Sequence, residues 1–524
     1  MGRILRLGLM MLLVAAAGVG NVWGENWVAW WGWQYETIDE TTCRIRLRES
    51  NQSSISSVTI PSEVEDGGLS FTVVEIAPYA FEGCSKLEEV IIPNSVTTIR
   101  ELAFCDCEKL ATVNIPSSVT TIGERAFKFC VNLTRVYIPK RVTEIAAEAF
   151  YFCKSLATVD IPNSVTTIQK MAFWDCKSLA TVDIPNSVTT IQKMAFYGCG
   201  LKEVTIPSSV KTIGDGAFSY CNQLTEFKVD EENASYSEDG GVLFTKNRDT
   251  IVSYPGGRKG DYEIPGSVMR IDAGAFSGCS GLTAVEIPSS VGWIGPNAFA
   301  YCRSLNTVYV YRPNDQEFTV DEKAFDGIDG KSATLYVRLG MKEQIQDEPW
   351  CINGKFKNIV EFCVVTFDAN GGTPAPGAQT VVEDGTATAP KAPTKEGYTF
   401  AGWQLDGKKY DFSKPVTEDI TLVAKWKKKE ESTPSTPKDS ETAVESVQLA
   451  GVRVVRNPVG EALELEGMER AARVEVYSVV GARVHAEALR GAPRVVIDAQ
   501  GWASGVYVVR VVASDGERTL RVVK

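Results

Sequence analysis

The chain has very little histidine: one residue among 524, His485, close to its C-terminus. Ser-His-Asp, Cys-His and zinc-histidine chemistries are therefore excluded for residues 25–446. No Cys-x-x-Cys pair occurs either, so the usual ligand pattern of a structural zinc site is missing. These absences favour a binding or structural protein over an enzyme, and the sequence indicates neither a metal nor another cofactor.

Long apolar runs and an excess of positive charge are also lacking. No segment after residue 24 approaches the 18 apolar residues of a membrane-spanning helix. Residues 25–446 hold 41 basic side chains against 57 acidic ones, a net charge of −16. Because so acidic a surface repels phosphates, and because we find no basic patch with interleaved aromatics, we exclude nucleic acid as the partner.

The first 24 residues have the pattern of a signal peptide. Two arginines precede an apolar run over residues 7–17, and small residues before position 25 suit cleavage after Gly24. No cysteine follows the cleavage site directly, so we expect no lipoprotein anchor. The rest of the chain is expected to be exported.

What the chain has in abundance is one repeated motif, Ala-Phe-x-x-Cys-x-x-Leu-x-x-Val-x-Ile-Pro. Its first six copies are spaced by 23 residues, within the range of leucine-rich repeats. Val and Ile alternate as in a strand with one inward face, and the Pro ends that strand at the same place in each copy. We therefore expect a solenoid of stacked coils in which each repeat Phe packs on its counterpart. The repeat phenylalanines are Phe81, Phe104, Phe127, Phe150, Phe173, Phe196, Phe218, Phe276, Phe299 and Phe325.

The motif, continued by Ser-Val-x-x-Ile, resembles the BspA-like, or Treponema-type, leucine-rich repeats. The resemblance covers residues 55–362, and we expect residues 25–54 to form an N-terminal cap. Members of that family are mostly surface proteins, and several are adhesins for host matrix proteins or neighbouring cells. The resemblance therefore implies a solenoid that binds protein or cell-surface ligands.

One segment interrupts the repeat, because Phe218 and Phe276 are 58 residues apart. Two apolar stretches, 242–244 and 251–254, flank a polar turn and predict a hairpin insertion at about 230–262 that projects from the rod. The acidic stretch 230–239 lacks the ligand spacing of an EF-hand loop, so we interpret it as a solvated approach to the hairpin rather than a calcium site. One residue is also missing near Gly200, where the spacing falls to 22.

Thirteen cysteines in an exported chain leave disulfides and buried thiols as alternatives. Nine of them follow a repeat Phe by three residues, a place where such repeats often carry a buried Asn or Cys, and this spacing favours a ladder of reduced thiols. A bridge between Cys351 and Cys363 stays open as an alternative for the end of the solenoid. The nine are Cys84, Cys107, Cys130, Cys153, Cys176, Cys199, Cys221, Cys279 and Cys302.

The candidate ligand-binding residues lie between the inward Val and Ile of each coil, where no packing role constrains them. Solenoids commonly bind along the strand face, and interface energy concentrates in a few aromatic anchors. Tyr137 and Tyr309 are therefore candidate anchors, and Asp160 and Asp183 would attract a basic partner. Two stacked carboxylates also resemble a hydrolytic pair, but an exposed position copied between coils explains them better. The full row is Ile91, Asn114, Tyr137, Asp160, Asp183, Thr205, Glu286 and Tyr309.

A cluster of aromatic residues lies near the expected mature N-terminus. Covering the exposed apolar end of a solenoid explains these residues better than a sugar-stacking platform does. They are Trp27, Trp30, Trp31, Trp33 and Tyr35.

Residues 363–427 form a different module, with short strand patterns between Gly and Pro turns. Its segments VTFDANGG, GYTFAGW, YDF and ITLVAKW resemble the internalin-type B-repeat, also called the Listeria-Bacteroides repeat. The resemblance implies a small β-grasp module that serves as a stalk or auxiliary binding unit. Residues 428–446, rich in Lys, Glu, Ser, Thr and Pro, are predicted to be a flexible linker.

Residues 447–524 alternate as strands. NPV at 457–459, VEVYSVVGARV at 474–484, GVYVVRV at 505–511 and the terminal RVVK resemble the C-terminal sorting domain of type IX secretion. The resemblance implies an Ig-like β-sandwich that the type IX machinery recognises at the outer membrane and removes while it joins the protein to lipopolysaccharide. An ordinary β-sandwich binding domain is the alternative.

These segments predict a mostly β chain: a leucine-rich-repeat solenoid, a small β-grasp module and a C-terminal Ig-like β-sandwich. The favoured function is a cell-surface adhesin at the outer membrane that recognises host matrix proteins or partner cells through its solenoid. The alternatives are a surface glycan-capture protein or hydrolase, and a structural spacer.

Overall fold

The structure, a computed structural model, describes residues 28–30, 32–47, 54–312, 317–351 and 355–429. In the C-terminal segment it describes 453–454, 462–466, 473–478, 483–488, 494–499, 502, 506–513 and 516–523. The chain divides into two compact units, Met1–Lys429 and Glu430–Lys524. The predicted signal peptide, Trp27, Trp31 and residues 430–446 of the predicted linker lie outside the described residues.

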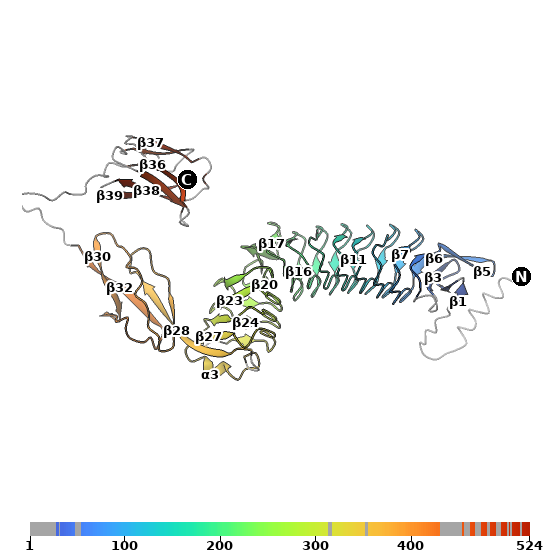
Figure 1. The fold of residues 1–524 in the computed structure, drawn as a ribbon, viewed down its shortest axis with the longest axis horizontal. Coiled ribbons are helices and arrows are strands. Elements are labelled where there is room, and N and C mark those ends of the chain that lie inside the picture. Colours follow the sequence, from blue (N-terminus) through green and yellow to red (C-terminus); the bar gives the residue numbers. More distant parts are fainter. Residues whose placement is uncertain are drawn as a thin grey trace, which may run out of the picture. The chain divides into compact units, whose positions relative to one another are not determined.

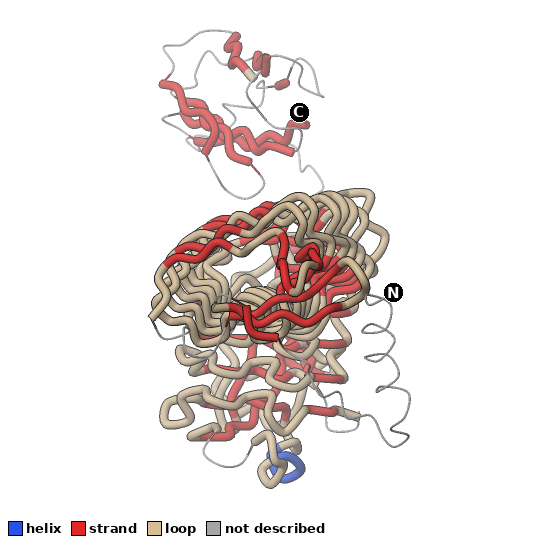
Figure 2. Tube along the Cα trace, turned by 90° about the vertical axis from the view of Figure 1, so that its right-hand side faces the viewer, coloured by secondary structure: helices blue, strands red, loops and turns tan. Residues whose placement is uncertain are grey.

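Two parallel rows of short strands run along the solenoid. Each row pairs equivalent residues of successive repeats, such as Val136 with Val159 in the first row and Ile168 with Ile191 in the second. Figure 1 shows the coils stacked side by side, and the view in Figure 2 shows that strands occupy only part of each coil, with loops and turns between them. The predicted solenoid is confirmed.

The first row comprises β4 (Ser57–Thr59), β7 (Glu89–Ile91), β10 (Arg135–Tyr137), β12 (Thr158–Asp160), β15 (Glu203–Ile206), β17 (Glu226–Val229), β21 (Gly260–Glu263), β23 (Leu282–Ile287), β25 (Thr307–Val310), β27 (Thr334–Arg338) and β28 (Asn358–Asp368). The second row comprises β8 (Thr98–Ile99), β9 (Thr121–Ile122), β11 (Glu144–Ile145), β13 (Thr167–Ile168), β14 (Thr190–Ile191), β16 (Thr212–Ile213), β20 (Thr250–Ser253), β22 (Arg270–Ile271), β24 (Trp293–Ile294) and β26 (Thr319–Val320). We call the outer side of the first row the strand face.

At the N-terminal end, a small sheet precedes the coils and continues into the second row through the pairing of β6 with β8. Its strands are β1 (Val28–Trp30), β2 (Trp33–Thr37), β3 (Thr42–Leu47), β5 (Glu63–Asp66) and β6 (Leu69–Ile76). The one described helix of the closing coil is α3 (Lys342–Ile345).

Stacked phenylalanine rings form the centre of the core. The repeat phenylalanines are at most 2% exposed. Successive rings within each run of repeats stack with centroids 4.7–5.6 Å apart. Across the longer spacing the stack is interrupted: Phe227 meets Phe218 edge-on, and Tyr254 takes the place of a repeat Phe by stacking on Phe276 at 4.9 Å. The predicted stacking is thus confirmed within each run.

A ladder of thiols runs beside the rings. All thirteen cysteines are buried and unpaired, so Cys351 and Cys363 do not form a bridge. In most coils the thiol donates to the carbonyl oxygen of the repeat Phe one coil earlier, as Cys130 Sγ does to Phe104 O at 3.1 Å. Burial raises the pKa of Cys130 well above its ordinary value, which keeps the thiol protonated. The buried-thiol interpretation is confirmed.

The turns around nine of the ten repeat phenylalanines depend on two residues with a left-handed backbone, two positions before and two after the ring. Around Phe127 these are Arg125 (φ 58°) and Phe129 (φ 61°). Such a conformation costs a side-chain-bearing residue about 1–2 kcal/mol. In return, the N–H groups of residues 125, 127 and 129 all donate to carbonyls of the next coil, at 2.8–3.0 Å.

The predicted hairpin forms, but the interpretation that it projects from the rod is wrong. β19 (Val242–Thr245) pairs antiparallel with β18 (Tyr236–Asp239) and with β20, and β20 then pairs in parallel with β22 of the next coil. Leu243, Phe244 and Ile251 are at most 1% exposed. The reason is that β20 takes a regular place in the second row, so its apolar side chains fill the solenoid core.

One long strand, β28, continues from the solenoid into the following module. Its first half pairs in parallel with β27, and its second half pairs with β29 (Gln379–Val382) and β32 (Ile420–Lys428). β30 (Tyr398–Leu405) and β31 (Lys408–Lys409) complete the sheet. The sequence boundary at residue 363 therefore falls inside a strand. Residues 363–429 are all described and contain no helix, so the β-grasp assignment stays a prediction.

The C-terminal unit contains two sheets, with strand orders β33-β34-β37 and β36-β35-β38-β39. Its core includes Leu463, Val476 and Val511, each fully buried. This arrangement confirms the predicted Ig-like β-sandwich. The strands are β33 (Arg453–Val454), β34 (Ala462–Glu466), β35 (Arg473–Ser478), β36 (Arg483–Ala488), β37 (Arg494–Asp498), β38 (Val506–Ala513) and β39 (Gly516–Val523).

Candidate functional site

Tyr137 is the most exposed aromatic residue at the predicted site. It ends β10, and its side chain is 55% exposed because the neighbouring Val136 and Ile138 take the inward positions. Arg135 lies over its ring, with the guanidinium carbon 5.5 Å from the centroid, and donates from Nη1 to the Tyr137 hydroxyl at 2.7 Å. The guanidinium therefore restrains the orientation of an exposed ring.

The two predicted acidic residues differ in how the backbone holds them. Asp160 ends β12 and pairs in register with Tyr137, so ring and carboxylate project from adjacent strands. Asp183 is also exposed, but it lies in a segment, 180–184, that is not assigned to a strand. The structure thus brings Tyr137 and Asp160 together and places Asp183 beyond them on the same side, without strand pairing to hold it.

Tyr309 lies apart from this group and has a packing role. Its ring stacks on Tyr336 with centroids 4.5 Å apart and meets the edge of Phe362 at 5.9 Å. The first row is interrupted between β17 and β21, which separates Tyr309 from Tyr137. The expectation that the outward row has no packing role is therefore wrong for Tyr309, because the last coils and β28 supply rings that cover it.

The sequence reasoning missed the partners of Tyr309. Tyr336 lies between the buried Leu335 and Val337, which is the same alternating signal one coil further on. Tyr311 donates from its hydroxyl to Glu286 at 3.0 Å and lies 3.2 Å from the Thr380 hydroxyl. The alternation at Tyr336 can be recognised in the sequence, whereas the contact of Tyr311 with Thr380 depends on the module that begins at residue 363.

Two of the N-terminal aromatics, Trp33 and Tyr35, are core residues. Trp33 is 8% exposed and meets the ring of Phe81, the first repeat phenylalanine, edge-on at 5.9 Å. Tyr35 is 4% exposed and donates to Asp66 Oδ2 at 2.6 Å. Neither ring offers a free face to a sugar, so for these two residues the packing role holds.

The acidic stretch 230–239 serves the turn that enters the insertion. Asn233 is fully buried, donates to the carbonyls of Pro207 and Val210, and accepts N–H donors from residues 235 and 236. Asp230 accepts the backbone N–H of Glu232 at 2.9 Å. These contacts fasten the segment to the preceding coil.

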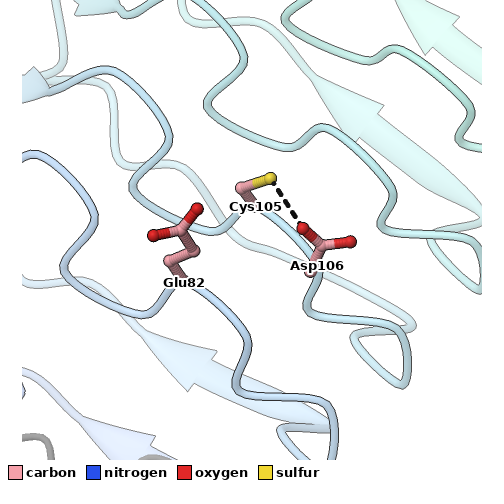
Figure 3. Close-up of side chains that lie close together, drawn as sticks. All are labelled: Glu82, Cys105 and Asp106. Carbon is pink, nitrogen blue, oxygen red and sulfur yellow. Dashed lines mark hydrogen bonds between the residues drawn. The ribbon is translucent and has the colours of Figure 1, made fainter.

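Among the described residues, one group of three side chains is close enough to share a metal ion: Glu82, Cys105 and Asp106 (Figure 3). The Cys105 thiol donates to Asp106 Oδ2 at 3.1 Å. Burial and this hydrogen bond raise the pKa of Cys105 to about 12, so the sulfur keeps its proton at neutral pH. In this arrangement Cys105 and Asp106 form a local hydrogen-bonded pair beside Glu82.

Comparison with known families follows the same division of the chain. The BspA type leucine rich repeat region matches in six copies over residues 50–180, 143–240 and 260–336, more than half of the chain. The chain belongs to the BspA-type leucine-rich repeat family. The Listeria-Bacteroides repeat domain matches residues 364–425, and the secretion system C-terminal sorting domain matches residues 456–524. All three predicted resemblances are confirmed.

Solved structures of bacterial repeat proteins are similar to this BspA-type chain. A leucine-rich cell surface protein from Faecalibacterium prausnitzii A2-165 is 28% identical with a TM-score of 0.53, over 66% of this chain and 95% of that one. The pneumococcal vaccine antigen PcpA is 21% identical with a TM-score of 0.41, over 60% and 82%. A leucine-rich repeat protein from Bacteroides ovatus is 21% identical with a TM-score of 0.36, over 63% and 98%.

The sorting domain assigns a destination. Type IX sorting domains direct export to the cell surface or outer membrane, and this BspA-type protein is a bacterial surface protein of that kind. Within the described part of the chain, no helix has the length and apolar character needed to span a membrane.

Proposed function

We propose that this protein is a cell-surface adhesin whose solenoid binds host matrix proteins or partner cells through the strand face. The observation that carries the proposal is Tyr137, an aromatic ring 55% exposed beside Asp160 and oriented by Arg135. A ring that is already ordered loses little conformational entropy on binding, and tyrosine is a frequent interface anchor.

The charges of the strand face support a basic partner. Asp160 and Asp183 are exposed, and further along the face Lys228 is shared between Glu203 at 2.7 Å and Glu226 at 3.3 Å, which leaves an acidic excess. Attraction by exposed acids raises the association rate and weakens with ionic strength. Tyr309 contributes a second contact area with Tyr336, separate from that of Tyr137.

We include in the proposal that the protein is not an enzyme. The sequence alternative of a hydrolase rests on Asp160 and Asp183, and both side chains are exposed to solvent. A catalytic acid of a glycosidase needs an enclosed setting that raises its pKa. The glycan-capture alternative rested on tryptophans, of which Trp33 is buried.

The test is binding of the exported chain to an array of matrix proteins and glycans, followed by a triple variant, Tyr137→Ala, Asp160→Ser and Asp183→Ser. We expect the variant to bind its protein ligand at least about tenfold more weakly with an unchanged melting temperature. A matched control changes exposed residues elsewhere on the coils: Tyr79→Ala, Glu144→Ser and Asp215→Ser. Equal loss in both triple variants, or loss in neither, would contradict a strand-face site.

We further propose that the type IX machinery recognises residues 447–524, removes them and joins the protein to lipopolysaccharide. Val522 is fully buried in β39, which pairs along its length with β38. Deleting Val522–Lys524 should abolish surface display in fractionated cells. The substitution Lys524→Ala is a smaller change at the same end that should keep the sandwich intact, and it serves as the comparison. Unchanged display of the deletion variant would refute recognition at this end.

A further inference from the structure

A second row of aromatic rings runs outside the core, on the turns that follow the repeat phenylalanines. Neighbouring rings have centroids 3.8–5.9 Å apart, so the row is continuous from coil to coil. None of these rings belongs to the two apolar cores of the solenoid. We call this row the turn ridge; it comprises Phe129, Tyr151, Phe152, Trp174, Tyr197, Tyr220 and Tyr301.

The ridge stays continuous past the insertion. Trp174 and Tyr197 stack with centroids 3.8 Å apart, Tyr220 follows Tyr197 at 4.8 Å, and Tyr220 meets Tyr301 at 5.6 Å. Between the last two lies Gly278, where an added Cβ would come within 2.6 Å of the Tyr220 ring. A glycine at that coil therefore leaves the space that Tyr220 fills. Tyr301, at the end of the row, is 45% exposed.

Lysines lie on the ridge, and the acids beside it are neutralised. Lys154 Nζ lies 4.1 Å from the centroid of Phe152, and Lys128 Nζ lies 4.6 Å from that of Tyr151. Glu148 is paired with Arg125 at 2.8 Å and with Lys128 at 2.7 Å, and its side chain is only 9% exposed.

One coil further on, a lysine again pairs with an acid beside the ridge. Lys177 lies 3.5 Å from Asp175; the lysine side chain is 63% exposed and the aspartate only 15%. At these coils solvent therefore meets the ammonium groups of Lys154 and Lys177 more than the carboxylates of Glu148 and Asp175. Stacking thus brings together lysines and aromatic rings, some of which lie about one repeat apart in the sequence.

The orientation of the rings selects the ligand. Because Tyr151, Trp174 and Tyr197 cover one another's faces, their edges are what solvent meets. Ring edges carry positive partial charge and favour anions, as ammonium groups do. Nucleic-acid bases need a free ring face for stacking, which these residues do not offer. An extended acidic segment places several carboxylates along one line, as the ridge places ring edges and ammonium groups.

We propose that the turn ridge is a second docking surface, which binds an acidic polypeptide segment. This proposal goes beyond the strand-face function and does not depend on it, since the two surfaces share no residue. Tyrosine and tryptophan are among the side chains most enriched at the centres of protein interfaces, and the exposed ammonium groups of the ridge would attract an acidic partner.

The experiment measures fluorescence anisotropy of a labelled poly-glutamate peptide with the full chain. We expect saturable binding that weakens as salt rises, because the contacts are charge-assisted and exposed. The double variant Lys154→Glu, Lys177→Glu should weaken binding by about tenfold, and Tyr301→Ala, which removes the most exposed ring, by about threefold. The matched control Lys140→Glu, Lys211→Glu makes the same charge change at exposed sites outside the ridge and should stay within about twofold of the unmodified chain.

Two comparisons decide the outcome. The strand-face triple variant should bind poly-glutamate as the unmodified chain does. The ridge proposal and the strand-face proposal can therefore fail independently of each other. Equal effects of the two lysine pairs would overturn the ridge proposal. So would tighter binding of an oligothymidylate or of polygalacturonate than of poly-glutamate, because either would show that the ridge selects another class of polyanion.

Discussion

Replacing Phe150 by Ala should destabilise the solenoid locally and severely. The ring is fully buried, with the rings of Phe127 at 5.6 Å and Phe173 at 5.5 Å on its two faces. A buried Phe-to-Ala change costs about 3–5 kcal/mol, and the amount depends on how far the site can collapse. Here the coils on both sides are tied by backbone hydrogen bonds of 2.9 Å, from Phe127 N to Ala149 O and from Phe150 N to Ala172 O. The cavity therefore stays open, and we expect a loss of about 4–5 kcal/mol, at the upper end of that range.

The assay is hydrogen exchange combined with guanidinium unfolding. Because each coil contacts only its neighbours, protection should fall first in the coils around residues 127–173 and less in those beyond Phe276. Tyr137→Ala, an exposed change on a neighbouring coil, is the control and should stay within about 0.5 kcal/mol of the unmodified chain. A cost for Phe150→Ala below about 1.5 kcal/mol, or a uniform loss of protection, would refute the stacked-ring account.

Three further predictions address the rest of the solenoid. Arg125 and Lys128 lower the pKa of Glu148 from 4.5 to about 2. The stabilising effect of the Glu148 carboxylate should therefore be complete above pH 4.5 and disappear as the pH falls towards 2. Melting curves of Glu148→Gln should differ from those of the unmodified chain by up to about 3 kcal/mol at pH 6 and converge with them at low pH. Thiol titration of unfolded, non-reduced protein should find most of the nine repeat cysteines free, and near-complete oxidation would contradict the buried ladder. Gly200→Ala should lower the free energy of unfolding by about 2–3 kcal/mol, measured by thermal unfolding, because the added Cβ would lie 2.2 Å from the Lys177 carbonyl oxygen. The control is Gly83→Ala at φ 71°, where the added Cβ would meet nothing within 4 Å, and it should cost only about 1 kcal/mol. Equal losses of stability in the two variants would contradict the close approach at Gly200.

The close approach at Gly200 lies in the shortened repeat. The sequence shows one residue missing there, and the structure shows the backbone of the shortened coil pressed against the preceding coil at Lys177. Elsewhere the period was enough to predict burial: the residue three positions after nine of the ten repeat phenylalanines is a buried cysteine, because each coil repeats the same inward positions. Position in the repeat and depth in the core are linked directly in a stack where each coil touches only its neighbours.

The candidate site was predicted less well than the coil. Tyr137 is exposed as expected, because the alternation of Val136 and Ile138 alone decides which side chain points outward. Tyr309 has the same alternation but is covered by Tyr336 and Phe362, whose positions depend on how the last coil meets β28. The outward pattern predicts direction, whereas exposure depends on neighbours from other segments.

By itself, the sequence determined the period, the inward residues, the stacked rings, the thiol ladder and the three family resemblances, because each follows from residues within one repeat or one motif. Only the tertiary structure decided that the insertion completes the second row, that β28 joins two modules in one strand, and that lysines and rings a repeat apart form one ridge. These features arise from contacts between residues 20 or more positions apart in the chain, and such contacts exist only once the coils have stacked.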